Sequence, residues 1–250
     1  MHLTELVLPI LWVTCFITPL YFTRVSRVGD PYVPKVARHR IVLAGLGVVI
    51  SLTIQAILQH YTGDNIVYSL HLAFNPRAII VTAAVILIAY LPSIITTLTA
   101  GQHFSLSISA IPTAPGLRVV LFAPVFEEIV YRAQCIGPYI IAGETPWGAI
   151  VYASAVFAVS HAHHVVNLRL RGFPWSHCVS VAAFTAAYTG LFGLFTTMVL
   201  VKTQSTLACI VAHSLCNYLG LPDLSVFRGW WVLGQLVAVA VSTYLCVHVM

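Results

Sequence analysis

Two adjacent glutamates, with an arginine four residues after the second, stand in an otherwise apolar stretch of this 250-residue sequence. Glu127, Glu128 and Arg132 all fall in a run that is long enough to cross a lipid bilayer. Each ionisable side chain at membrane depth costs roughly 2.5–3.5 kcal/mol on insertion scales. Three such side chains so close together therefore indicate that this stretch has a function.

The spacing separates the roles of the two glutamates. Glu128 and Arg132 are at i and i+4, so they share one helix face and can form a buried ion pair. Glu127 points about 100° away round the helix. Because two unpaired neighbouring carboxylates resist joint ionisation, pairing of Glu128 with Arg132 leaves Glu127 free to titrate. In a partly desolvated cavity, Glu127 would suit general-base catalysis.

Two further apolar segments carry polar groups at membrane depth. The first is Phe157-x-x-x-His161, and the second holds His213 and Asn217, again at i and i+4. We expect His161, brought alongside Glu127, to share in activating a water molecule. His213 and Asn217 can aim two hydrogen-bond donors at one developing oxyanion. The pattern predicts hydrolysis of a carbonyl compound, with water as the nucleophile.

Each of these residues also has a structural interpretation. The Glu128–Arg132 pair can serve architecture alone, and Asn217 can join two helices by a hydrogen bond. We interpret His163 and His164 as interface residues. The specific signal is the order of the three motifs on separate apolar runs: Glu-Glu-x-x-x-Arg, Phe-x-x-x-His and His-x-x-x-Asn.

The composition indicates what positions these motifs. Hydrophobic residues make up 59% of the chain and charged residues only 8%, whereas soluble domains are about 25% charged. We therefore predict an all-α polytopic membrane protein: a single domain over 1–250, with about eight transmembrane helices around a cytosol-facing cavity and a catalytic core at about 118–223. The first run lacks a basic leader and is expected to be retained. The apolar runs fall at about 6–22, 41–58, 78–98, 118–140, 147–161, 178–201, 206–219 and 230–249.

The net charge of +5 reflects topology rather than nucleic-acid binding. Nine of the twelve Lys and Arg residues lie in the loops after the first, third, fifth and seventh runs, and two lie on the opposite side. By the positive-inside rule, the first set of loops is cytosolic. With eight full spans both termini are lumenal, and one re-entrant segment would reverse the C-terminus. Proline is expected to keep the first loop free of helix, at Pro31 and Pro34.

The six cysteines point to neither a disulfide framework nor a thiolate metal site. All fall in or beside apolar runs, and none shows CxxC spacing. We expect them to be reduced thiols that pack as small hydrophobic side chains.

The three motifs are similar to those of the intramembrane glutamate proteases of the CAAX-protease and bacteriocin-processing superfamily. The chain more closely resembles the eukaryotic branch, the type II CAAX prenyl endopeptidases. The resemblance covers roughly 118–223, with a weaker match at Asp30-Pro31. It extends to four stretches beyond the first motif: Val159-Ser-His-Ala-His-His164, Leu168-Arg-Leu-Arg171, Ala186-Ala-Tyr-Thr-Gly-Leu-Phe-Gly193 and His213-Ser-Leu-Cys-Asn-Tyr-Leu-Gly-Leu-Pro222.

The resemblance implies a role for each motif residue. Glu127 and His161 would activate the attacking water, and His213 and Asn217 would form the oxyanion site. Glu128 and Arg132 would support the architecture, and no metal or other cofactor would be needed.

The resemblance also implies the substrates and their place. The enzyme would remove the C-terminal aaX residues from farnesylated or geranylgeranylated CAAX proteins, such as Ras-type small GTPases. It would work in the endoplasmic reticulum membrane as a multi-pass protein in contact with lipid. The active site would be accessible from the cytosol, and no nucleic acid would be bound.

Three rival functions remain open at the level of sequence. A zinc metalloprotease could use the same residue types; the HExxH motif is absent, but ligands on separate helices would leave no such motif. A transporter could use Glu127, Glu128 and Arg132 as a proton relay, although we find no sequence repeat. A relative of the same superfamily could process other peptides, against which stands the long match at 162–170.

Overall fold

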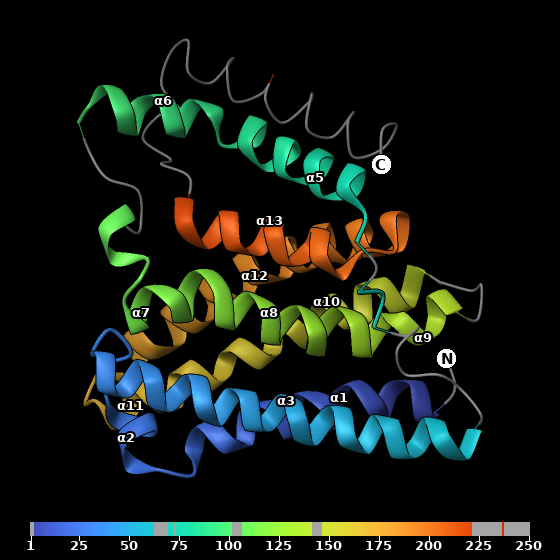
Figure 1. Cartoon of the computed structure of the whole chain (residues 1–250). Coiled ribbons are helices and arrows are strands. Elements are labelled where there is room, and N and C mark those ends of the chain that lie inside the picture. Colours follow the sequence, from blue (N-terminus) through green and yellow to red (C-terminus); the bar gives the residue numbers. More distant parts are fainter. Residues whose placement is uncertain are drawn as a thin grey trace.

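The computed structural model describes residues 3–62, 70–72, 74–101, 107–141, 147–221 and 237. Within these residues the chain is helical and contains no strand (Figure 1). The predicted all-α membrane bundle is therefore confirmed. The predicted run at 230–249 lies outside the described residues apart from Val237.

Three helical stretches in the described residues are long and apolar enough to cross a membrane by themselves, and a pair of helices bent by 59° would make a fourth. The other predicted runs are not counted for identifiable reasons. Two form apolar helices of only 10–17 residues, namely Val7–Tyr21 and Thr206–Leu219, and 118–140 is divided by two π-helical segments. The three stretches are Pro34–Tyr61, Trp147–Leu170 and Trp175–Thr203, and the bent pair is Pro76–Ala89 with Leu91–Thr99.

The N-terminal part is a close helix pair. Helix α1 (Leu3–Ile17) packs on α3 (Pro34–Thr62), and a Cβ atom added at Gly47 would lie 2.7 Å from the Phe16 carbonyl oxygen. Our expectation of a helix-free first loop is wrong. Helix α2 (Arg24–Val28) lies in this loop, capped by the Thr23 side chain. Helix α3 begins at Pro34 itself, because proline is favoured in the first helical turn.

The predicted run at 78–98 is one bent unit. Helix α5 (Pro76–Ala89) ends at Tyr90, and α6 (Leu91–Thr99) leaves at an angle of 59°. Pro92 has no backbone N–H to donate across the junction, which accounts for the bend. Figure 1 shows α13 (Thr206–Leu219) alongside α5.

The segment with the two glutamates runs between α3 and α13 (Figure 1). Each of its two π-helical parts widens the helix by one residue per turn, a feature frequently found at functional sites. Together they flank the turn that carries Glu127 and Glu128. In order, the parts are α7 (Ala114–Leu117), η3 (Arg118–Phe122, π-helical), α8 (Ala123–Glu128), η4 (Ile129–Gln134, π-helical) and α9 (Cys135–Ile141).

The second motif lies on a longer helix than predicted. Helix α10 (Trp147–Ser160) continues through a 3₁₀ turn at His161–His163 into α11 (His164–Leu170). Helix α12 (Trp175–Thr203) packs against α10. The contact is close because it is made by glycine: a Cβ atom on Gly193 would lie 3.2 Å from a ring carbon of Phe157.

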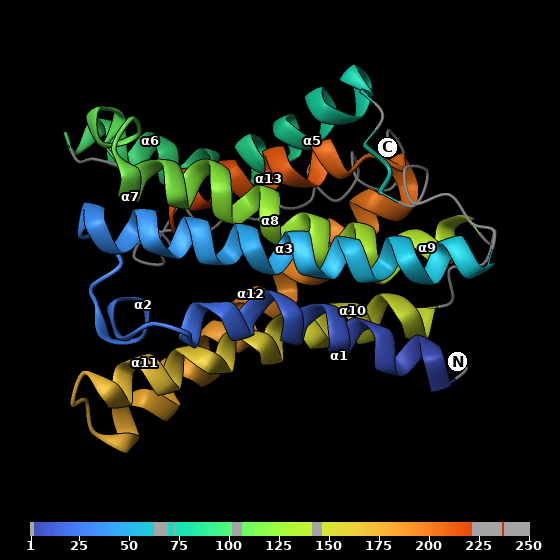
Figure 2. The ribbon, with the colours of Figure 1, turned by 60° about the horizontal axis from the view of Figure 1, so that its bottom comes forward.

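The ends of the bundle separate the two sets of loops. Figure 2 shows α2, α7 and α11 at one end, and the N-terminus with α9 at the other. Helices α2 and α11 are in contact, so the basic first loop and the Arg169–Arg171 turn lie together. Two of the loops that the positive-inside rule assigns to one side therefore lie at the same end of the described bundle.

Candidate active site

The three motifs meet at one cavity of about 200 Å³. Glu127 reaches it from α8, His161 from the 3₁₀ turn after α10, and His213 and Asn217 from α13. Spacing within each motif predicted the paired faces, and the packing of the three segments brings the faces together.

Glu128 is fully buried and contacts two partners. Its Oε2 atom lies 3.1 Å from Nε of Arg132, which is the predicted ion pair. Its Oε1 atom lies 2.7 Å from Nδ1 of His213. Our sequence reasoning missed this second contact, because it joins residues 85 positions apart and no spacing rule relates them.

Arg132 ties the first motif to two other helices. Its Nε and Nη2 atoms donate to the Thr196 hydroxyl of α12, at 2.8 and 2.5 Å. Its guanidinium carbon lies 4.2 Å from the centre of the Phe157 ring of α10, within the range of a cation–π contact. The Arg132 side chain thus contacts α8, α10 and α12.

Phe157 forms the wall between the two histidines. Its ring centre lies 4.7 Å from that of His161 and 6.4 Å from that of His213. The Tyr131 ring packs edge-on against it at 4.7 Å. Phe157 is only 1% exposed, so its buried ring is a rigid packing surface for both imidazoles.

The hydrogen bond of His161 identifies its tautomer. Nδ1 lies 2.8 Å from the Phe157 carbonyl oxygen. A carbonyl oxygen can only accept, so Nδ1 carries the hydrogen. In the neutral ring Nε2 is then the nitrogen that can take up a proton.

Glu127 differs from Glu128 in its access to the cavity. Its side chain is 20% exposed, whereas that of Glu128 is 0% exposed. Its Oε2 atom lies 3.9 Å from Nε2 of His213. The two carboxylates therefore flank one imidazole, and Glu127 is the one that faces the cavity.

Asn217 uses one of its two amide hydrogens inside the protein. Nδ2 donates to the carbonyl oxygen of Val119, at 2.9 Å, in the first π-helical segment. The bond anchors α13 to the glutamate segment. The second hydrogen of the amide is available to the cavity that Asn217 lines.

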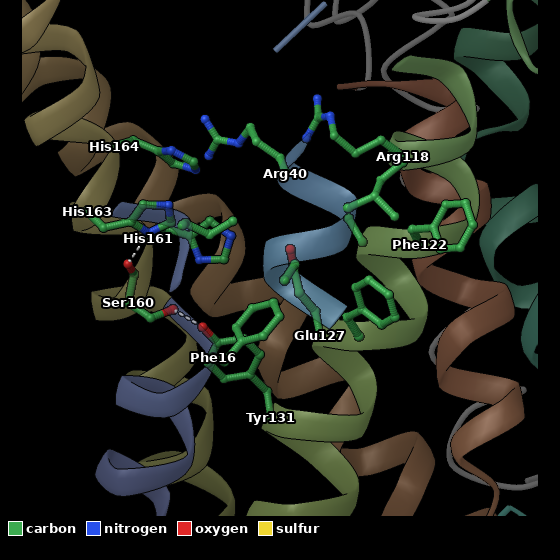
Figure 3. A pocket seen from close by; sticks show the side chains of 15 residues that line it. Phe16, Arg40, Arg118, Phe122, Glu127, Tyr131, Ser160, His161, His163 and His164 are labelled. Atoms are coloured by element: carbon green, nitrogen blue, oxygen red, sulfur yellow. Dashed lines mark hydrogen bonds between the residues drawn. The ribbon is translucent and has the colours of Figure 1, made fainter. Parts of the chain in front are cut away.

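Figure 3 shows the lining of a second cavity, of about 130 Å³. The two share Arg118, Ala123, Glu127 and His161 in their linings. The second cavity is also lined by Arg40, His163 and His164. Our sequence reasoning did not predict it, because Arg40 comes from α3, far from the motifs along the chain.

The described residues contain no group of three or more His, Cys, Asp or Glu side chains arranged to hold a metal ion. In this part of the chain the motif residues contact one another in pairs instead. Glu128 forms an ion pair with Arg132, and the His213 ring lies beside both glutamates.

The fold and the site define a class: a membrane-embedded helical bundle with a cavity of carboxylates, imidazoles and an amide. Within it, residues 109–219 match the family model described as Type II CAAX prenyl endopeptidase Rce1-like. The resemblance inferred from the motifs is thereby confirmed for this segment.

Curated relatives match over the same part of the chain. The chain is 35% identical over 105 residues to CAAX prenyl protease 2 of Caenorhabditis elegans, covering 42% of this chain and 39% of the relative. It is 34% identical over 107 residues to the Homo sapiens protein of that name, covering 42% and 32%. For Saccharomyces cerevisiae the identity is 33% over 116 residues, covering 43% and 36%. The match thus spans well under half of each relative, and no solved structure matches the chain significantly.

Proposed function

We propose that this chain is an intramembrane endopeptidase that removes the aaX residues from prenylated CAAX proteins without a metal ion. One observation carries the proposal: Glu127, His161, His213 and Asn217 line a single cavity. They do so within the segment that is similar to proteins named CAAX prenyl protease 2. The proposed domain is the single unit 1–250, with its core at about 118–223.

The first step is the activation of water. Glu127 and Nε2 of His161 are the proton acceptors at the cavity, and one of them takes a proton as the water oxygen bonds to the scissile carbonyl carbon. The proton then passes to the leaving amine as the carbon–nitrogen bond breaks. The exposure of Glu127 and the tautomer of His161 support these roles.

The second requirement is the stabilisation of the oxyanion. Asn217 has a second amide hydrogen to donate, besides the one that it gives to the Val119 carbonyl. His213 already directs Nδ1 at Glu128, so it donates from Nε2 only when the ring carries both hydrogens. The carboxylates of Glu128 and Glu127, at 2.7 and 3.9 Å, stabilise that cation. In this proposal Glu128 acts on the reaction through His213, in addition to holding Arg132.

The proposed substrates are farnesylated or geranylgeranylated CAAX proteins, including Ras-type small GTPases, at the endoplasmic reticulum membrane. Such substrates have a peptide tail in the cytosol and a lipid chain in the bilayer. A cavity among membrane helices suits both parts. The basic first loop and α11 lie together at the end of the bundle that the positive-inside rule assigns to the cytosol.

The test is cleavage of a farnesylated CAAX peptide by the purified protein, with release of the tripeptide followed by mass spectrometry. We expect turnover that a membrane-permeant chelator does not reduce. Glu127→Ala should lower turnover by roughly 10²–10⁴-fold while the protein still purifies as a folded monodisperse species. Thr53→Ala, at an exposed position of α3, is the control and should behave as wild type.

Other outcomes would select a rival function. Loss of activity in chelator, restored by added zinc, would replace the metal-free mechanism with a zinc-dependent one. Proton flux into liposomes without peptide cleavage would indicate a transporter. Cleavage of unprenylated peptides in preference to prenylated ones would indicate a different peptidase of the same superfamily.

A further inference from the structure

Two arginines line the second cavity, and neither forms an ion pair with a carboxylate of the described residues. Arg40 is only 8% exposed, and its Nη1 atom donates to the Ser26 carbonyl oxygen at 3.3 Å. The Nε atom of Arg118 is buried and makes no hydrogen bond to the residues that the structure describes. The ion pairs between described residues involve only Arg132 and His213 as the basic partner. Within the described part of the chain neither Arg40 nor Arg118 forms an ion pair. The Glu127 carboxylate lines the same cavity and attracts Arg118, so two positive charges there face one carboxylate.

The proximity of the two guanidinium groups increases the free-energy cost of burying them. Figure 3 shows Arg40 and Arg118 close together at one end of the cavity, with Glu127 further inside. Taking a cation out of water costs several kcal/mol unless a counter-charge is present. Two neighbouring cations also repel each other. A site of this kind is suited to an anion that comes from outside the protein.

The anion would be part of the molecule that reacts. The second cavity shares Glu127 and His161 with the reaction cavity, so a ligand held by the arginines reaches directly to the proposed base. An anion entering alone would be repelled by Glu127, and the two guanidinium groups offset that repulsion.

On the basis of the proposed aaX peptidase function, we propose that Arg40 and Arg118 bind the C-terminal carboxylate of the substrate tail. Guanidinium groups bind carboxylates through charge-assisted, often bidentate hydrogen bonds. The terminal carboxylate is the one charge that every aaX tail has, whatever its sequence. The prenylated part of the substrate is then directed into the first cavity, toward Phe192 and Tyr188.

A fixed carboxylate site also explains how the enzyme would select the peptide bond three residues from the C-terminus. Three extended residues span at most about 10–11 Å. Anchoring the last residue at Arg40 and Arg118 therefore decides which amide lies beside Glu127. The arginine pair acts as a positioning and specificity element and takes no part in the proton transfers.

The experiment compares two farnesylated CAAX peptides that differ only at the C-terminus, one with a free carboxylate and one with an amide. Wild type should prefer the acid in kcat/KM by roughly 10–100-fold. Arg40→Gln and Arg118→Gln should bring the acid/amide ratio close to one, through a higher KM for the acid. The arginine substitutions should lower kcat/KM much more for the acid than for the amide. Arg38→Gln, at an exposed position on the same helix as Arg40, should keep the full preference.

A binding measurement tests the proposal independently of the arginine variants, in case these fold poorly. Glu127→Gln protein, which should not turn over, should bind the acid peptide more tightly than the amide by a similar factor. Equal affinity for the two peptides would overturn the proposal. So would a wild-type ratio near one, or equal losses on both peptides in the arginine variants, which would indicate a structural role.

Two further results are separable. If wild type cleaves neither peptide, the proposed function fails, whereas cleavage of both at equal rates defeats only the carboxylate site. If phosphatidylglycerol in nanodiscs inhibits wild type, and Arg40→Gln and Arg118→Gln relieve the inhibition at an acid/amide ratio near one, the occupant is a lipid headgroup and the proposal is wrong.

Discussion

At the scale of residues, environment gives two adjacent glutamates different properties. Glu128 is enclosed between Arg132 and His213, and Glu127 faces a cavity. The i and i+4 spacing was sufficient to predict the ion pair. It was not sufficient to predict that His213 would share Glu128, which depends on how α13 packs against α8.

Replacing Glu128 tests this shared role. Glu128→Gln keeps the shape of the side chain but removes the charge that Arg132 and His213 both face. We expect a loss of stability of about 3–5 kcal/mol, because a buried charge is left unpaired. Turnover by the folded fraction should also fall, since His213 loses support for its doubly protonated form. Thermal unfolding in detergent and kcat per folded enzyme are the two measurements.

A double variant provides the control. Glu128→Met combined with Arg132→Met removes both charges and should recover much of the lost stability. It should not recover kcat, because His213 still lacks its acceptor. Full activity in the double variant would show that Glu128 has only a structural role.

Asn217 is the simplest test of the oxyanion site. Asn217→Ala should lower kcat by about 10²–10³-fold and leave KM nearly unchanged, as expected for a donor that acts on the transition state. Steady-state kinetics on the farnesylated peptide separates the two constants. A raised KM with an unchanged kcat would assign Asn217 to substrate binding instead.

At the scale of elements, apolar runs were good predictors of where helices lie and poorer predictors of where they end. The predicted fifth run stopped at His161 because polar residues follow, yet the helix continues to Leu170. Contacts from other helices reach this extension, as when Tyr21 donates to the His163 carbonyl at 2.8 Å. Hydropathy alone does not register such contacts. The signal for the bend after Tyr90 was present in the sequence, as Pro92.

No pattern in the sequence allowed us to predict the π-helical segments. They depend on contacts from other helices, such as the bond from Asn217 to the Val119 carbonyl. Another contact is a buried polar chain: Ser51 donates to Gln134 at 3.0 Å, and Gln134 donates to Gln55 at 2.8 Å. These bonds join α3 to the second π-helical segment. Helix-to-helix contacts of this kind are properties of the assembled bundle.

The contact between α10 and α12 yields a prediction at this scale. Gly193→Leu should push against Phe157 and Ser154, because a Cβ atom there already comes within 3.2 Å of the Phe157 ring and 3.4 Å of Ser154. We expect both a lower folded yield and a loss of turnover, since Phe157 supports His161 and His213. Size-exclusion profiles and kcat report the two effects.

Gly148→Leu is the matched control on α10. No heavy atom lies within 4 Å of a Cβ added at Gly148, so this variant should purify and turn over as wild type does. Equal damage from the two substitutions would mean that the α10–α12 contact does not position the site.

At the scale of the whole molecule, charge and fold agree on two distinct ends. The basic first loop, α7 and α11 lie at one end, and the N-terminus and α9 lie at the other (Figure 2). The two cavities lie among the helices that join these ends. The side of the membrane on which the basic end lies stays a prediction from the Lys and Arg count.

Cysteine labelling in sealed microsomes tests the orientation. With the cytosolic face outward, a membrane-impermeant maleimide should label Arg171→Cys directly. Lys202→Cys, toward the other end of α12, should react only after detergent is added. The unmodified protein gives the background, since its described cysteines are buried apart from the half-buried Cys15. The reverse pattern would place the basic end in the lumen and contradict the predicted topology.

The position of Phe157 restricts how such an enzyme can diversify. One ring packs against both His161 and His213, so a change of size at position 157 displaces the proposed base and the proposed oxyanion donor together. Tyr188 and Thr189 of α12 line the cavity that also holds His161 and His213, and they take no part in the proposed proton transfers. Selection or protein design can therefore alter substrate preference from α12, while the reactive groups on α8, α10 and α13 remain as they are.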